Sequence, residues 1–318
     1  MFTFLREVVA MKVLLAGSTG AIGRPLTRAL RAAGHEVVGL TRERERARTL
    51  VAAGVEPLVA DALDRDALLG AAADCGLRID AVIHQMTALS KPPARHSGMS
   101  RTNELRITGT RNLVDLATRS GARRFVTQSI VFGYGYRDHG TDLLTEDAPF
   151  GRPAGDRTDP HIEAMGVNEQ LVIGNDDLDG VSLRYGLFYR PDDAAMRDML
   201  RARKIPVPPG GGGELAWVHL DDAAEAAVAA VERGRPGAYN IVDDSPATWG
   251  EVTTAMAAAY GAPTPRVLPG WLIRMAAPYV GAMVLDTSMR VSAAKAREEL
   301  GWRPMYPTVR QGVRASAG

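Results

Sequence analysis

One short segment near the start, residues 12–23, constrains what this chain can fold into. Residues 13–16 (VLLA) form an apolar run typical of a strand buried on both faces, and the glycine-rich sequence GSTGAIG follows at once. Such a turn reverses sharply, lets backbone approach a pyrophosphate, and lets the next helix pack on the strand with its N–H groups facing the anion. The alternative is a glycine-rich turn without a ligand. We assign cofactor contacts here to Gly17, Thr19, Gly20, Ala21, Ile22 and Gly23.

The alternation of strand and helix continues beyond this segment. Apolar runs predict strands, and amphipathic stretches between them predict helices. With short loops, this order is typical of an α/β fold with a Rossmann-type, doubly wound parallel sheet. The predicted strands are 13–16, 36–40, 55–60, 80–84 and 124–129, and the predicted helices are 22–33, one ending near 53, 64–73 and 103–120.

Ligands of such a sheet bind outside the carboxyl ends of the strands. Asp61 and Ala62 follow the third strand, where an adenine ring is expected, and Asp61 is also a candidate cap for the helix at 64–73. Ser129 ends the fifth strand. The fourth strand leads into three further candidate cofactor contacts, Gln85, Met86 and Thr87.

The end of the second strand bears on the choice of cofactor. An NAD site usually has an acidic residue there for the ribose 2′-hydroxyl, whereas this strand ends in Leu40-Thr41-Arg42. Arg42 suits a 2′-phosphate, which favours NADP(H) over NAD(H). The alternative is that the mixed charges of residues 42–46 form a solvated helix face.

Composition excludes several classes of protein. The 318 residues can bury a large core, and a formal net charge of +1 gives no electrostatic case for binding nucleic acid or a membrane surface. The single cysteine, Cys75, excludes a disulfide framework and fits a reducing cytoplasm. No apolar run approaches the ~20 residues that cross a bilayer. Residues 1–10 contain Arg6 and Glu7 and are interpreted as a leader arm rather than an export signal.

Taken together, these motifs resemble the extended short-chain dehydrogenases/reductases, the superfamily that includes UDP-galactose 4-epimerase. The similarity runs from Met11 to about Val313. It rests on motifs in family order: the glycine turn, Asp61-Ala62, residues 82–84 (VIH), Asn103 with 109–113 (GTRNL), 125–129 (FVTQS), 183–191 (LRYGLFYRP), 217–224 (WVHLDDAA), 239–241 (YNI) and 299–304 (ELGWRP).

The resemblance implies a domain organisation. A large cofactor domain would comprise residues 11–188 and 217–247, and a smaller substrate domain residues 189–216 and 248–318. The loop at 208–213 (PPGGGG) is expected near the substrate cleft or as a plain surface loop. Asp222 is expected to cap a helix. By family analogy, Asn103 is a cofactor contact. The helix at Asn103 and the helix after Pro160 would pair in a homodimer. Four apolar residues are compatible either with this pairing or with core packing: Ile162, Met165, Leu171 and Val172.

The catalytic pair of the family is missing. Members use a Ser or Thr with a Tyr and a Lys four residues apart, and no Tyr here is followed four residues later by Lys. Ser129 fills the first role. The Tyr position falls on His161 or Ile162, and the Lys position on Met165 or Gly166.

Replacement of the Tyr by His161 is chemically coherent, because an imidazole titrates near pH ~6.5 without help, whereas a phenol titrates near ~10. Tyr134 and Tyr136 are rival proton donors, Tyr185 is a weaker one, and packing at the cleft edge is their alternative role. We assign the catalytic set as Ser129, His161 and Tyr134. The scattered carboxylates and histidines of residues 138–163 lack the spacing of a metal site.

Two functions are compatible with these residues. The first is an atypical NADP(H)-dependent oxidoreductase or epimerase, acting on the carbonyl or hydroxyl of a small polar or polyketide-like molecule with a proton donor other than Tyr. The second keeps the nucleotide site without hydride transfer, as an isomerase, cyclase, dehydratase or cofactor-sensing regulator.

Overall fold

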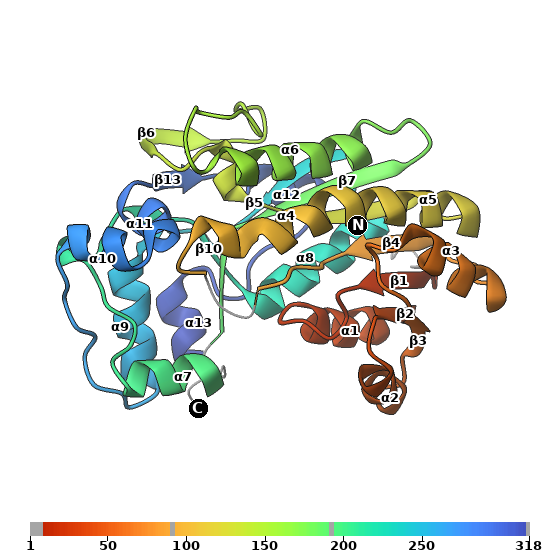
Figure 1. Ribbon diagram of the computed structural model, residues 1–318, viewed down its shortest axis with the longest axis horizontal. Helices are drawn as coiled ribbons and strands as arrows, with labels where there is room; N and C mark the ends of the chain where they lie inside the picture. The colour runs from red at the N-terminus through yellow and green to blue at the C-terminus, as the bar shows by residue number, and fades with distance from the viewer. Residues whose placement is uncertain (1–8, 90–92, 191–193, 316–318) are drawn as a thin grey trace, which may run out of the picture.

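A seven-stranded parallel sheet forms the centre of the computed structural model, which describes residues 9–89, 93–190 and 194–315 (Figure 1). The strand order is β11-β7-β5-β4-β1-β2-β3, so the order reverses between β1 and β4. This confirms the predicted doubly wound sheet and puts the crevice for a ligand beside β1. The strands are β1 (Lys12–Ala16), β2 (Glu36–Thr41), β3 (Glu56–Val59), β4 (Ala81–His84), β5 (Arg124–Ile130), β7 (Asp179–Tyr185) and β11 (Gly237–Ile241).

Helices cover both faces of the sheet, which explains the apolar strands. Val13 and Leu15 of β1 lie in one core with α1 (Gly23–Ala32) and α8 (Leu220–Arg233). Leu14 lies in a second core, on the opposite face. Side chains alternate along a strand, so β1 needs apolar residues at every position. The second core includes residues of α3 (Arg65–Asp74) and α5 (Thr110–Ser120), and α2 (Arg44–Ala52) packs beside β2 and β3.

The helix predicted at 103–120 starts earlier and is interrupted. It consists of α4 (Ser100–Glu104), a π-helical turn η2 (Leu105–Gly109) and α5. His84 at the end of β4 donates from Nε2 to the carbonyl oxygen of Leu105 (3.2 Å). The π turn therefore lies where the helix is hydrogen-bonded to the carboxyl end of β4. Such turns are frequent at functional sites.

Short strand pairs connect the later segments to the earlier ones. β6 (Asp138–Leu144) pairs with β13 (Ser288–Val291), β8 (Leu187–Tyr189) with β10 (Trp217–His219), and β9 (Glu214–Leu215) with β12 (Ala247–Thr248). The division into two domains stays a prediction. The other elements are α6 (Asp159–Ile173), η1 (His96–Met99), η3 (Val131–Tyr134), α7 (Ala194–Arg201), η4 (Pro209–Gly211), α9 (Trp249–Ala259), α10 (Gly270–Ala276), α11 (Pro278–Leu285), α12 (Ala294–Glu299) and α13 (Val309–Ala315).

Figure 1 shows α7, α9, α10, α11 and α13 together at the end of the molecule opposite β3. No helix in the described ranges has the length and apolar character needed to cross a membrane. Residues 1–8 of the predicted leader arm lie outside the described residues.

Two predicted helix caps are wrong. Asp64, not Asp61, caps α3, because its Oδ1 accepts from the N–H of Ala67 (3.0 Å). His219, not Asp222, caps α8, accepting from the N–H of Asp221 (3.2 Å). The Asp222 carboxylate instead accepts from two backbone N–H groups in the loop before α13, at 305 and 306.

Core packing accounts for three of the four apolar residues considered for a dimer face. Ile162, Met165 and Val172 are each fully buried within the chain. Ile162 and Met165 belong to one core cluster and Val172 to the other, so these side chains are not available to a second copy. The homodimer stays a prediction.

Candidate functional site

The glycine turn has the backbone that a pyrophosphate site needs. Gly17 has φ +96°, a left-handed conformation that favours glycine. A Cβ on Gly23 would lie 2.0 Å from the carbonyl oxygen of Gly17, so only glycine fits where α1 meets the turn. No side chain caps α1 at Ile22, and its first turn has no acidic residue. The start of α1 is therefore open to an anion, with Thr19, Gly20 and Ala21 in the turn before it.

Two arginines, Arg42 and Arg46, come after β2, and Arg46 contacts the glycine turn. The side chain of Arg42 is 60% exposed. Arg46 on α2 donates from Nη1 to Oγ1 of Thr19 (3.4 Å) and pairs with Glu43 (2.8 Å). Sequence reasoning named Arg42 and missed Arg46, because a helical run of alternating charges also fits a solvated face.

The ends of the strands lie along one edge of the sheet. Parallel register aligns Ala16 of β1 with Leu40 of β2 and His84 of β4. The residues that follow these strand ends therefore share this edge, with Gly17, Arg42 and Gln85 among them, and Ser129 of β5 lies near the same edge because Thr127 pairs with His84. Beyond β3, Asp61 accepts from the N–H of Leu63 (3.0 Å) and lies 3.6 Å from Arg101, and Ala62 accepts from Asn112 (2.8 Å).

His84, the last residue of β4, is held by hydrogen bonds at both ring nitrogens. His84 accepts at Nδ1 from the N–H of Met86 (3.1 Å) while its Nε2 donates to Leu105. Burial lowers the pKa of His84 to about 4, so the ring is neutral and holds one tautomer. Gln85 donates to the hydroxyl of Tyr185 (3.3 Å), and Met86 and Thr87 follow, partly buried.

Ser129, the residue before the last one of β5, has a buried hydroxyl. It is fully buried, and its Oγ has no hydrogen-bond partner among the described residues. Thr127, two residues earlier on the same face, donates to Asn168 of α6 (2.8 Å). Ser129 therefore faces the helix that holds His161.

His161 lies in the first turn of α6 and is only 3% exposed. Asn103 of α4 donates from Nδ2 to Nδ1 of His161 (3.0 Å), and Nε2 of His161 lies 3.1 Å from Nδ1 of His96. Both ring nitrogens therefore have protein partners. Met165, one turn further along α6, is fully buried and apolar.

The environment of His161 differs from the one expected for a general acid near pH 6.5. Burial lowers its pKa to about 4, and the nearby His96 and Arg106 add to the effect. His161 is therefore neutral at pH 7. The sequence could not reveal this shift, because it depends on burial and on two side chains from other segments.

Tyr134, an expected proton donor, belongs to a different network. Its hydroxyl donates to Asn240 (2.8 Å) and accepts from Arg184 (2.9 Å), which forms a buried ion pair with Glu169 (2.8 Å). Burial raises the pKa of the Tyr134 hydroxyl. Tyr134 is therefore held in a buried polar network, and its role as a proton donor stays a prediction.

The hydroxyl groups of Tyr136 and Tyr279 face each other at 3.1 Å, and the ring of Tyr279 packs edge-on against His161 with centroids 5.4 Å apart. Tyr185 is also buried, and its hydroxyl donates to the carbonyl oxygen of Ala223 (3.4 Å). Burial raises the pKa of Tyr136, Tyr279 and Tyr185 alike.

Sequence reasoning missed three residues of this cluster: His96, Arg106 and Tyr279. Arg106 is only 5% exposed and acts electrostatically on Tyr136, His161 and Tyr279. A helical arginine usually extends into solvent, and Tyr279 lies far along the chain, so neither gives a local signal.

Several buried polar atoms in this region have no hydrogen-bond partner among the described residues. Such atoms are uncommon in folded proteins, and a site that binds a ligand explains them. They are Oε1 of Gln85, Oδ1 of Asn103, Nη1 of Arg106, Oε1 of Gln128 and Oγ of Ser129.

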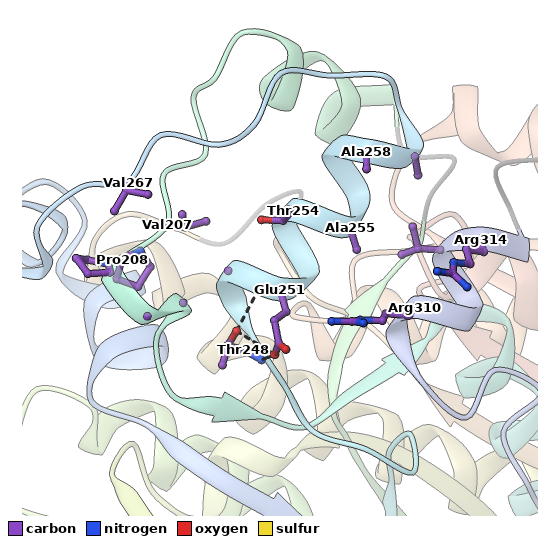
Figure 2. A pocket seen from close by; sticks show the side chains of 16 residues that line it. Val207, Pro208, Thr248, Glu251, Thr254, Ala255, Ala258, Val267, Arg310 and Arg314 are labelled. Atoms are coloured by element: carbon purple, nitrogen blue, oxygen red, sulfur yellow. Dashed lines mark hydrogen bonds between the residues drawn. The ribbon is translucent and has the colours of Figure 1, made fainter.

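A cavity of about 1040 Å³ lies elsewhere in the molecule. Figure 2 shows it between the loop at Val207 and Pro208, α9 and α13, with Arg310 and Arg314 on its α13 side. The predicted loop at 208–213 lines it in part, and no residue of the buried cluster does. No group of three or more metal-binding side chains was found within the described part of the chain.

Comparison with known proteins gives matches along nearly the whole chain. The profile of the NAD dependent epimerase/dehydratase family matches residues 13–242. A 3-diazoavenalumate denitrifying reductase from Streptomyces sp is 40% identical over 316 residues, which are 95% of this chain and 99% of that protein. A 2-alkyl-3-oxoalkanoate reductase from Stenotrophomonas maltophilia (strain K279a) is 27% identical, covering 80% of this chain and 77% of that one.

Among solved structures, UDP-glucose 4-epimerase from Thermus thermophilus, determined as a complex with NAD, has a TM-score of 0.74. It is 25% identical in sequence, and the match covers 97% of this chain and 99% of that one. The similarity therefore includes the later segments as well as the glycine turn.

Proposed function

We propose that this chain is an NADP(H)-dependent reductase of a small organic acid. The chain belongs to the NAD dependent epimerase/dehydratase family and is an enzyme of the short-chain dehydrogenase/reductase type. The substrate that we favour bears a diazo group. The named relative that is 40% identical is a denitrifying reductase of a diazo acid, and its similarity covers 95% of this chain. The proposal explains why the Tyr and Lys of the family are dispensable here.

The residues at the sheet edge fit the cofactor. The open start of α1 and the left-handed Gly17 suit a pyrophosphate, and Gly23 gives the close packing behind it. Arg42 and Arg46 suit a 2′-phosphate, since Arg42 directly follows β2 and Arg46 on α2 contacts Thr19 of the glycine turn. When bound, the cofactor supplies a hydride.

One observation supports a reaction without a side-chain acid at the reacting atom. His161, one of the two candidates for the family's Tyr position, is neutral and has both nitrogens bonded within the protein, and the Lys position on the same helix falls on buried Met165 or on Gly166. Reduction of a carbonyl needs a proton on oxygen, whereas reductive loss of a diazonium group does not. In that reaction the C–N bond breaks, dinitrogen leaves with the bonding pair, and the hydride forms the new C–H bond.

In this reaction the side chains of the site bind and orient the substrate and do not donate protons to it. Ser129 offers an unpartnered hydroxyl to the substrate. The hydrogen bonds from Asn103 to His161 and between His161 and His96 fix α4, α6 and η1 relative to one another. The edge-on packing of Tyr279 on His161 helps to exclude water, which competes with hydride for a diazonium carbon.

Reduction of a 3-oxo acid is the second candidate, favoured by the paired hydroxyls of Tyr136 and Tyr279 as a proton source. The 27% identical relative is a reductase of such acids. Burial raises the pKa of both phenols, so they keep their protons at neutral pH and are poor acids in the free enzyme. For that reason we rank this reaction below the first.

The test uses 3-carboxybenzenediazonium, made from 3-aminobenzoate and ¹⁵N-labelled nitrite, with NADPH or NADH. We expect benzoate and mass-29 dinitrogen at a rate well above the enzyme-free blank, with faster turnover for NADPH. Acetoacetate serves as the 3-oxo acid probe. Gly20→Asp is the matched control, because it puts a negative charge in the exposed glycine turn and should abolish turnover while the protein stays folded.

Reduction of acetoacetate without dinitrogen release would favour the second candidate. Tight NADP⁺ binding without hydride transfer to either probe, or to a broad panel of diazo and carbonyl compounds, would overturn the reductase proposal and support a non-redox function.

A further inference from the structure

Arg106 is a buried cation without a counter-ion among the described residues. Its side chain extends from the π-helical turn η2, and the residue is only 5% exposed. Its guanidinium forms no hydrogen bond or ion pair with any described residue, and Nη1 is fully enclosed without a partner. Burial lowers the pKa of its guanidinium from the usual value. A folded protein rarely keeps a charge in this state unless the charge has a use.

The groups around Arg106 do not neutralise it. Its electrostatic neighbours are the phenols of Tyr136 and Tyr279, which are protonated at neutral pH, and the imidazoles of His84 and His161, which are uncharged there. No carboxylate of the described residues is among them. The site therefore has one uncompensated positive charge.

The position of Arg106 separates it from the cofactor's phosphates. Its two tyrosine neighbours come from the segment after β5 and from α11, and its two histidine neighbours from the end of β4 and from α6, whereas the glycine turn follows β1. Tyr279 is bonded to the loop before η1 through its N–H and the carbonyl of Ala94 (3.1 Å), which places α11 over this part of the site. The guanidinium thus lies on the side that a substrate would occupy.

We propose that Arg106 binds an anionic oxygen of the substrate, a carboxylate or a phenolate, and so selects organic anions. The inference rests on the proposed function only for the identity of the substrate pocket. Arg106 supplies the cation that the chain lacks at the family's Lys position, from the neighbouring helix instead of α6. The rigid bond from His84 to the carbonyl of Leu105 fixes the turn that presents it.

The test measures binding rather than turnover. Benzoate, 4-nitrophenolate and the neutral isostere benzamide are titrated calorimetrically into wild-type protein, Arg106→Met and Arg106→Lys, with and without NADP⁺. Arg111→Met is the matched control, an exposed arginine on α5. We expect Arg106→Met to weaken benzoate or 4-nitrophenolate binding by about 10- to 100-fold, with benzamide unchanged, as for loss of a charge-assisted hydrogen bond. Arg106→Lys should keep part of the affinity.

Thermal melting of the ligand-free proteins separates binding from a structural role. A buried charge without a partner is unfavourable, so Arg106→Met should melt at the same temperature as wild type or higher. A lower melting temperature with an unchanged preference for benzoate over benzamide would overturn the proposal. Equal wild-type affinity for anions and benzamide would also overturn it. If 4-nitrophenolate binds more tightly than benzoate, the anionic group that Arg106 binds is a phenolate. If benzoate binds more tightly, it is a carboxylate. Anion selectivity that depends on Arg106 would stand even where no hydride transfer is found.

Discussion

Replacing His161 with glutamine should make the protein less sensitive to acid. His161 has its pKa lowered to about 4 by burial and by His96 and Arg106, whereas an unfolded histidine titrates near ~6.5. The unfolded state therefore binds more protons between these values. Stability from the neutral ring is fully present above pH ~6.5 and is lost as the pH falls toward about 4, at ~1.4 kcal/mol per pH unit. The wild type should lose about 2 kcal/mol from this group between pH 7 and pH 5.

Urea titrations at pH 7 and pH 5 measure the effect as a difference in the free energy of unfolding. Glutamine keeps a hydrogen-bonding amide without a titrating proton, so His161→Gln should lose about 2 kcal/mol less than wild type between the two pH values. His84 titrates with the same sign and continues to contribute in both proteins. Glu163→Gln, on the exposed side of α6, is the matched control and should behave as wild type. An equal acid-induced loss in wild type and His161→Gln would refute a neutral, buried His161.

Three further predictions concern the cofactor site and the core. Arg42→Ala and Arg46→Ala should each weaken NADP⁺ binding by ~10- to 100-fold in calorimetric titrations and hardly change NAD⁺ binding, while equal losses would rule out a 2′-phosphate contact. Gly23→Ala would place a Cβ 2.0 Å from a carbonyl oxygen, so we expect a lower melting temperature and no cofactor binding; wild-type melting would contradict that packing. Glu169→Gln leaves Arg184 buried without its partner and should cost ~3–5 kcal/mol of unfolding free energy in urea, and a loss below ~1 kcal/mol would show that the pair is dispensable.

The sheet could be predicted from the sequence because its strands and turns depend on residues that are adjacent in the chain. A strand buried on both faces must be apolar at every position, as Val13 to Ala16 are, and the turn after it requires glycine wherever backbone approaches backbone. Helix caps were less predictable, since Asp61 and Asp64 both fit the sequence pattern and only the backbone selects Asp64. The π turn at Leu105 gave no local signal, and its hydrogen bond from His84 of β4 joins residues 21 positions apart in sequence.

The site could be predicted only in part, because burial changes what a side chain does. As a residue type, His161 is suited to titrate near neutrality, but its enclosure by His96 and Tyr279 lowers that pKa. Tyr134 follows the same strand as Ser129, but its hydroxyl is engaged by Arg184 from a neighbouring strand. Arg106 was missed because a helical arginine normally lies in solvent, and its burial depends on groups far apart in sequence.

Transfer of deuterium from [4-²H]NADPH tests the central claim most directly. The substrate is 3-carboxybenzenediazonium in H₂O, and the isolated benzoate is analysed by mass spectrometry and NMR. We expect one deuterium per molecule at the ring carbon that lost nitrogen, from one face of the nicotinamide only. Benzoate without deuterium, or hydroxybenzoate from attack by water as the sole product, would contradict hydride transfer at this site.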